Sequence, residues 1–170
     1  MDITQLILDD HYEQRRQFAI LDQVAHADTA ALGLVWDRLA AFLELHAVAE
    51  EKLFYPALLK VGKGAGSKDS AAAETKDAIC DHNDIRDAVA KVADHEVGTD
   101  KWYAAIAKAR EANSDHMGEE ERESLADFRR HTTLDQRHDV AVAFATFEAV
   151  NFAGVEARDK NPKRYIDKHQ

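Results

Sequence analysis

Apolar and polar positions along the chain repeat with the period of an α-helix, and no stretch alternates as a β-strand would. A capping box at Thr133–Gln136 marks the start of the last predicted helix. Together these patterns predict an all-α fold, an antiparallel up-and-down four-helix bundle with an additional C-terminal helix. The expected helices cover about residues 3–24, 29–59, 71–98, 100–128 and 133–150.

The predicted helices divide the chain near residue 130. Residues 1–130 are expected to form the four-helix bundle, and residues 131–170 a C-terminal helix and tail packed on it. The tail itself, EARDKNPKRYIDKHQ, is polar and without an apolar stripe, so we expect it to be loosely attached.

Charge and composition narrow the functional class. The 170 residues include 22 Lys and Arg against 32 Asp and Glu, a net charge of −10, which argues against nucleic acid and anionic membranes as partners. The first residues lack a signal-peptide pattern, and no apolar run has membrane-spanning length. Cys80 is the single cysteine, which excludes an intrachain disulfide. A cytoplasmic protein is the expectation.

Two polar pairs interrupt the apolar stripes. In LELHAVAEEKLFYPAL, His46 and Glu50 lie four residues apart and therefore share one helix face. His116 and Glu120 repeat this spacing 70 residues later. Buried imidazole and carboxylate groups cost free energy unless they are paired, so the pairs need a partner inside the bundle.

A lone histidine precedes each pair. His11 comes 35 residues before His46, and His82 comes 34 residues before His116. At about 1.5 Å rise per residue in antiparallel helices, these offsets bring all the polar side chains within about two turns of one level. The predicted cluster comprises His11, His46, Glu50, His82, His116 and Glu120.

Metal coordination explains this cluster better than an ion-paired network, because a cation satisfies all six groups at once. Four imidazoles and two carboxylates, with no thiolate, exceed the needs of one tetrahedral zinc. Two metal ions that share bridging carboxylates fit the count and the internal repeat. Iron is the expected metal, with zinc or manganese as alternatives.

Four motifs resemble those of the hemerythrin-like, or HHE cation-binding, family. The resemblance covers about residues 1–130 and implies a four-helix bundle with an oxo- or hydroxo- and carboxylate-bridged di-iron centre. It implies that the four histidines are terminal ligands and that Glu50 and Glu120 bridge the metals. The matching segments are DDHYEQRR, HAVAEEKLFYPAL, DHNDI and HMGEEERESL.

The chain departs from the oxygen-carrying hemerythrins at one place. Those proteins have a second histidine one turn from the first on the third helix, where this chain has Ala78 and Arg86 beside His82. Tyr55 is a candidate replacement ligand, or a hydrogen-bond donor to a ligand, because similar relatives share its FYP segment. An ideal helix places Tyr55 half a turn away from His46, although Pro56 could distort it.

The remaining polar neighbours are expected to be solvent-exposed. Glu51 and Glu119 adjoin the bridging candidates but should point about 100° away from them. The histidines outside the predicted level are expected at the surface, and these are His26, His95, His131, His138 and His169.

The resemblance leaves several functions open. The first hypothesis is decomposition of hydrogen peroxide by a catalase-like or peroxidase-like di-iron enzyme. The alternatives are reversible binding or sensing of dioxygen or nitric oxide, and iron buffering. All three predict a small-molecule or metal ligand, and none identifies a protein partner.

Overall fold

The computed structural model describes residues 1–169, which form helices and contain no strand. The prediction of an all-α fold is therefore confirmed. The elements are α1 (Ile3–Leu21), α2 (Thr29–Ala49), the π-helix η1 (Glu50–Phe54), α3 (Tyr55–Val61), α4 (Ala71–Val92), α5 (Asp100–Arg122), α6 (Ser124–His131), α7 (Leu134–Val150) and α8 (Pro162–His169).

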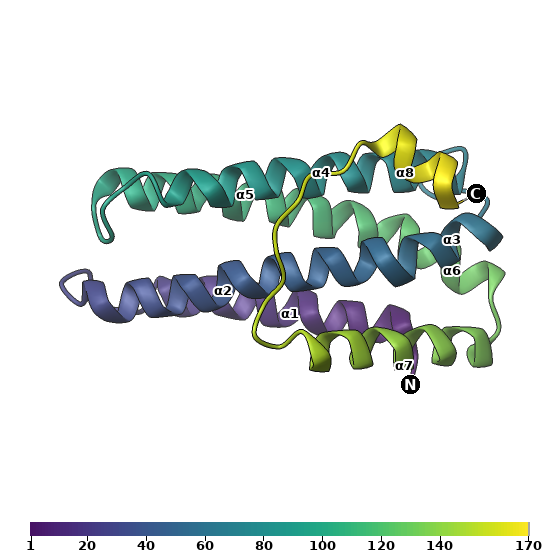
Figure 1. Ribbon diagram of the computed structural model, residues 1–170, viewed down its shortest axis with the longest axis horizontal. Coiled ribbons are helices and arrows are strands. Elements are labelled where there is room, and N and C mark those ends of the chain that lie inside the picture. Colours follow the sequence, from purple (N-terminus) through teal and green to yellow (C-terminus); the bar gives the residue numbers. More distant parts are fainter. Residues whose placement is uncertain (170) are drawn as a thin grey trace.

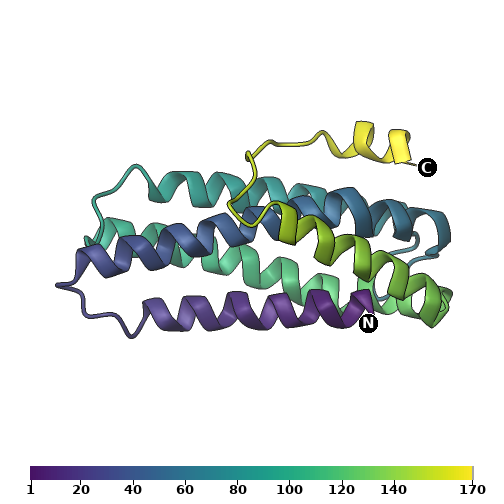
Figure 2. The same cartoon turned by 60° about the horizontal axis from the view of Figure 1, so that its bottom comes forward.

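The four long helices lie side by side along the longest axis of the molecule (Figures 1 and 2). α1 packs against α2, and α4 packs against α5. The α1–α2 and α4–α5 connections lie at one end, and the α3–α4 connection lies at the other (Figure 1). α7 runs outside this group against α1, α2 and η1.

Side-chain caps fix the starts of the helices. Asp28 accepts a hydrogen bond from the backbone of Ala31, and Ser70 accepts one from Ala73. Aspartate and serine are both favoured at this position, because their side-chain oxygens accept from free backbone N–H groups of the first helical turn. The capping box of Thr133 and Gln136 is also present, with both reciprocal hydrogen bonds.

The second predicted helix differs from a continuous α-helix. α2 changes into η1 at Glu50, and the backbone N–H of Tyr55 bonds to the carbonyl of Glu50, five residues earlier. Pro56 follows directly and has no N–H to offer, which weakens the α-helical pattern at this point. The fourth predicted helix is also broken, at Glu123, where α5 ends and α6 begins.

The expectation of a loosely attached tail was wrong. The chain leaves α7, crosses the α2 side and continues as α8 against α4 (Figure 1). Tyr165 in α8 is buried and donates a hydrogen bond to the carbonyl of Glu51. Lys160 and Asn83 also exchange two hydrogen bonds, so the tail is fixed at several points.

The core consists of two apolar clusters. One lies toward the α1–α2 and α4–α5 connections and contains Trp36 and Trp102, and the other contains Phe54, Phe128 and Phe144. The predicted polar residues lie between them along each long helix. No helix within residues 1–169 is long and apolar enough to span a membrane.

Candidate metal centre

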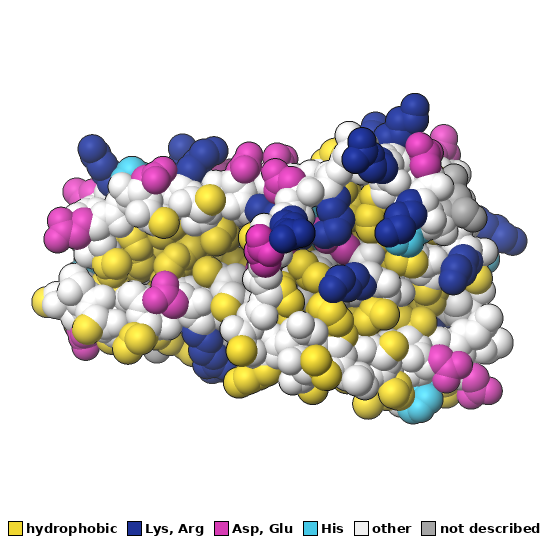
Figure 3. Space-filling model, viewed as in Figure 1, with side chains coloured by type: hydrophobic (Ala, Val, Ile, Leu, Met, Phe, Trp, Pro, Cys, Tyr) yellow, Lys and Arg dark blue, Asp and Glu magenta, His cyan; other side chains and the backbone are white. Residues whose placement is uncertain are grey.

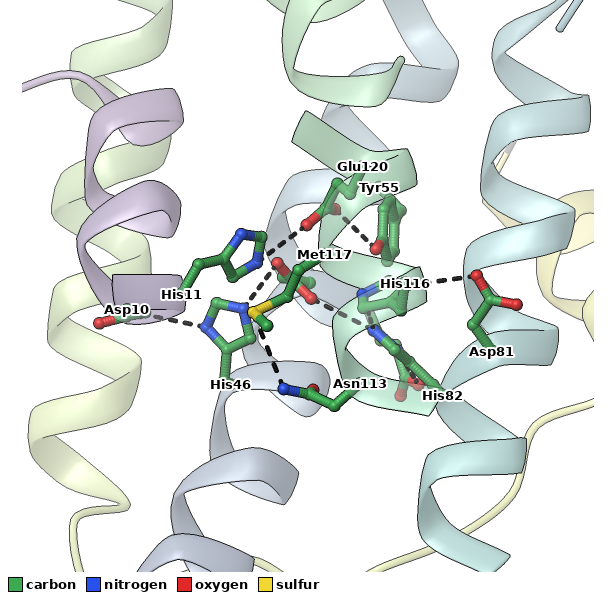
Figure 4. A network of polar contacts seen from close by, with 12 residues as sticks. Asp10, His11, His46, Tyr55, Asp81, His82, Asn113, His116, Met117 and Glu120 are labelled. Atoms are coloured by element: carbon green, nitrogen blue, oxygen red, sulfur yellow. Dashed lines mark hydrogen bonds and ion pairs between the residues drawn. The ribbon is translucent and has the colours of Figure 1, made fainter. Parts of the chain in front are cut away.

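The six residues predicted to cluster come together inside the long helices (Figure 4). Each is buried, with at most 4% of its surface exposed. They fall into two groups whose potential ligand atoms lie within 4.8 Å of one another. The first group is His11, His46, Glu50 and Glu120, and the second is Glu50, His82 and His116.

Glu50 belongs to both groups because its two oxygens point in different directions. Oε1 lies 3.0 Å from Nε2 of His46, and Oε2 lies 3.3 Å from Nε2 of His82. The Nε2 atoms of His82 and His116 are 3.1 Å apart. Glu50 therefore faces one histidine of each group with a different oxygen.

Glu120 faces His11 and Tyr55. Its Oε2 lies 3.4 Å from Nε2 of His11, and its Oε1 accepts a 2.7 Å hydrogen bond from the Tyr55 hydroxyl. Burial and the nearby carboxylates of Glu120 and Glu50 raise the pKa of Tyr55 well above its usual value. The hydroxyl therefore keeps its proton and acts as a donor.

The π-helix explains why Tyr55 reaches the site. Because Tyr55 bonds to the carbonyl of Glu50 across five residues, it follows Glu50 on the same side, as a residue four positions later does in an α-helix. The ideal-helix geometry, which placed Tyr55 half a turn away from His46, was wrong for this segment. Single π-helical turns are frequent at functional sites.

A carboxylate contacts the outer nitrogen, Nδ1, of every histidine in the cluster. Because a carboxylate only accepts hydrogen bonds, each Nδ1 is the donor and each Nε2 is free to bind a metal in the interior. Sequence reasoning missed these carboxylates. The four pairs are His11 with Glu121 at 3.0 Å, His46 with Asp10 at 3.1 Å, His82 with Glu51 at 3.0 Å and His116 with Asp81 at 3.4 Å.

These contacts form a closed ring around the centre. α1 supplies the carboxylate for the histidine of α2, and η1 supplies the one for α4. α4 supplies the carboxylate for the histidine of α5, and α5 supplies the carboxylate for the histidine of α1. The sequence carried a partial signal for the ring, since His-x-x-x-Glu-Glu occurs twice and an aspartate directly precedes both His11 and His82.

The predicted exposure of Glu51 was wrong. Its side chain is fully buried, where it accepts from Nδ1 of His82 and from Arg86, and pairs with Lys160. Burial acts to raise the pKa of Glu51, but these three partners lower it to about 2, so the carboxylate stays charged. Glu119, in contrast, is about half exposed, as expected.

Several buried atoms of the cluster lie close to one another but make no hydrogen bond of normal geometry among residues 1–169, and such atoms are costly. A cation bound between them would satisfy all of them together, and nitrogen and oxygen donors suit a first-row transition metal. The residues present therefore fit a metal centre. The atoms concerned are Nε2 of His11, Nε2 of His46, both oxygens of Glu50 and Oε2 of Glu120.

Protons would occupy the cluster without a metal. Burial lowers the pKa of His46, but Glu50 and Asp10 outweigh it and raise that pKa well above its usual value. Burial is likewise outweighed at His82, where Glu50 and Glu51 raise the pKa to about 9. A metal ion would displace these protons, so its binding should be coupled to proton release.

A family model, the hemerythrin HHE cation-binding domain, matches residues 2–127. The chain belongs to this family. No curated protein and no solved structure matches the chain. As an HHE domain it carries the buried histidine and glutamate groups expected of a cation-binding bundle. α7 and α8 lie beyond the matched residues.

In this hemerythrin-like chain, Ala78 and Arg86 lie one turn from His82, where oxygen-carrying hemerythrins have a second histidine. Neither residue supplies a ligand in its place. Arg86 turns its guanidinium toward Glu44 and Glu51, at 2.8 and 2.9 Å. Ala78 is buried and carries no ligand atom. The histidines predicted to lie at the surface are outside both groups and are at least partly exposed, namely His26, His95, His131, His138 and His169.

Proposed function

We propose that the protein is a non-haem di-iron protein whose main reaction is with hydrogen peroxide. α1, α2, α4 and α5 form the antiparallel up-and-down bundle in this proposal. His11 and His46 would hold one iron, His82 and His116 would hold the other, and Glu50 and Glu120 would be shared between them. Bound iron would supply Lewis acidity and the electrons needed for cleavage of the O–O bond.

The small donor set of the His82 position carries this proposal. The group around His82 offers three ligand atoms, and a bridging Glu120 would bring the number there to four. Because Ala78 and Arg86 add no ligand to the second group, a small molecule has room to bind there. A groove of about 280 Å³ borders this position and is lined in part by Ala47, His82 and Arg86.

Figure 3 shows apolar side chains along the furrow between α2 and α4 that contains this groove. An apolar approach favours small neutral molecules such as peroxide over charged metabolites. Tyr55 would then hold a proton at its hydroxyl oxygen, 2.7 Å from Glu120, within reach of a small molecule at the centre.

The decisive experiment is to measure oxygen evolution from hydrogen peroxide by the iron-loaded protein. We expect turnover in the natural sequence and its loss in His82→Ala. His95→Ala is the matched control, because His95 is partly exposed and outside both ligand groups. Equal turnover in the two variants would show that the His82 position does not take part in the reaction.

Reversible binding of dioxygen or nitric oxide is the second candidate. It is favoured by the burial of all six candidate ligands, which keeps water away from the metals. A ferrous protein that forms a long-lived oxygen adduct and leaves peroxide untouched would support this function instead. Iron buffering would be supported by a protein that exchanges iron and performs neither reaction.

Metal stoichiometry tests the bridging assignment. We expect two iron ions per chain, falling to one or fewer in Glu50→Ala and in Glu120→Ala. Glu119→Ala is the control, since its half-exposed carboxylate adjoins Glu120 without entering either group. Full occupancy in both bridging variants would contradict the assignment.

A further inference from the structure

The segment beyond α7, here called the C-terminal strap (residues 155–169), contacts the metal centre from outside the family domain. We propose that this strap is part of the centre and that Lys160 is a positioning residue for His82. The proposal rests on the proposed binding of two metal ions. It predicts that the strap governs affinity at the His82–His116 position and leaves the other position largely unaffected.

Glu51 connects the strap to His82. Oε1 of Glu51 accepts from Nδ1 of His82 at 3.0 Å and from Arg86 at 2.9 Å. Its other oxygen, Oε2, pairs with the ammonium group of Lys160. The backbone carbonyl of Glu51 accepts from the Tyr165 hydroxyl. Two strap residues therefore hold the residue that orients His82.

The strap is fixed to α4 beside the same histidine. The side-chain amide of Asn83 donates to the carbonyl of Lys160 at 2.9 Å, and its oxygen accepts from the Lys160 backbone at 3.1 Å. This pair of hydrogen bonds sets the position from which Lys160 reaches inward. Lys and Arg side chains gather over this part of the surface in Figure 3, so the strap brings cations to an otherwise acidic protein.

The other half of the centre is built differently. Glu121 occupies the place of Glu51 and accepts from His11 at 3.0 Å and from Arg15 at 2.7 Å. Its side chain is 28% exposed, whereas that of Glu51 is fully buried. Water can therefore complete the hydrogen bonds of Glu121, but Glu51 depends on protein groups alone. The strap makes the two metal positions unequal.

Loss of the Lys160 ammonium would leave a buried carboxylate oxygen without its donor. Glu51 would turn to find another partner, and His82 would lose its fixed orientation. Hydrogen-bond partners of metal-bound histidines typically contribute 10- to 100-fold to metal affinity. Loss of the Arg15 cation should reduce metal affinity at the His11 position less, because solvent screens the exposed Arg15–Glu121 pair.

The test is a Co²⁺ titration of the full chain against a competing chelator. We expect Lys160→Met to weaken Co²⁺ binding at the His82–His116 position by at least about tenfold. The Co²⁺ affinity of the other position should stay within about twofold. Lys160→Arg, which keeps a cation, should restore most of the affinity. Lys163→Met is the control on the strap, because Lys163 is exposed, and Arg15→Met should have the smaller effect.

The second readout is the proton NMR spectrum of the Co²⁺-loaded protein. The Nδ1–H resonance of His82, assigned by its loss in His82→Gln, should shift in Lys160→Met, while those of His11 and His46 should not. Tyr165→Phe, which removes only a hydroxyl, should shift the same resonance and provides a second variant if Lys160→Met folds poorly.

The outcomes separate this inference from the proposed function. Fewer than two Co²⁺ ions bound by the natural sequence would contradict the two-metal proposal itself. Two bound ions, with affinities and His82 resonance unchanged in both Lys160→Met and Tyr165→Phe, would overturn the role of the strap alone.

Discussion

At the scale of single residues, the Tyr55 hydroxyl is a donor to a buried carboxylate that has few alternatives. Replacement by phenylalanine would leave Oε1 of Glu120 without its 2.7 Å partner. We expect Tyr55→Phe to lower the unfolding free energy of the metal-free protein by about 1–3 kcal/mol. Denaturant unfolding measures this loss. Tyr12→Phe, at a side chain 63% exposed, should change little, and equal losses would contradict this role.

Glu74 gives the protein a predicted pH dependence. Burial and the carboxylates of Asp127 and Glu123 raise its pKa to about 7 from an ordinary 4.5, although the backbone of Ala65 donates to it. The folded state therefore binds this proton more tightly than the unfolded state. The resulting stabilisation is complete below about pH 4.5 and is lost as the pH rises through 7.

Glu74→Gln removes this titration while keeping an oxygen for Ala65. We expect the variant to match the natural sequence near pH 5 and to exceed its stability by up to about 3 kcal/mol at pH 8. Denaturant unfolding at both pH values, at equal metal content, tests this difference. Glu156→Gln, on an exposed side chain, controls for the change in net charge. A difference that does not vary with pH would contradict the prediction.

The sequence predicted which residues would cluster, because a spacing of four on a helix fixes a shared face. It did not predict the burial of Glu51, since helical periodicity describes one helix at a time and Glu51 is covered by Lys160 and Tyr165 from the far end of the chain. Asp10 and Asp81 left only a partial signal, because each directly precedes a histidine of the cluster, but so does Asp115, which is not part of the ring.

At the scale of elements, η1 shows where a regular period misleads. A count at 100° per residue assumes an uninterrupted α-helix, and one π-helical turn before Pro56 invalidates it for Tyr55. Elements with clear caps were predicted well. Thr133, for example, begins α7 as expected, because its capping box depends only on residues close in sequence.

α7 lies beyond the family domain but covers one side of the centre. Phe144 is fully buried, and its ring meets His46 edge-on at a centroid distance of 6.0 Å. We expect Phe144→Ala to cost about 3–5 kcal/mol of stability through the cavity it leaves. We also expect faster loss of metal to a chelator, because that cavity opens the His46 side to water.

The control for this prediction is Phe152→Ala, just after α7, where the side chain is 88% exposed. Its stability should stay within about 0.5 kcal/mol of the natural sequence, with an unchanged rate of metal loss. Thermal unfolding and stopped-flow chelation measure the two effects. Similar release rates in both variants would mean that α7 does not shield the centre.

At the scale of the whole molecule, metal and fold should stabilise each other. The buried ligand atoms without partners make the metal-free bundle costly. At free metal about a thousandfold above its dissociation constant, binding adds about 4 kcal/mol, which corresponds to a rise in Tm of roughly 10 °C. Chelation under reducing conditions should reverse this rise in calorimetry. An unchanged Tm after verified metal loss would argue against a buried site.

The overall architecture was easier to predict than the attachment of its last residues. The four long helices followed from apolar stripes, whereas the strap carries only Tyr165 as a buried side chain in α8. Its attachment depends on polar contacts with Asn83 and Glu51. A pattern of apolar and polar positions does not predict such contacts. The division of the chain near residue 130 stays a prediction.

The closed ring of carboxylate–histidine contacts has a consequence for how such a centre could originate. Each half of the chain completes one contact by itself, as Asp10 does with His46, and supplies one to the other half, as Glu51 does for His82. The second half repeats both contacts with Asp81 and Glu121. Two identical copies of one helical hairpin, related by a twofold axis, would therefore close the same ring. A duplicated and fused gene for such a hairpin would inherit a complete centre, and only later additions, such as the strap, would make its halves different.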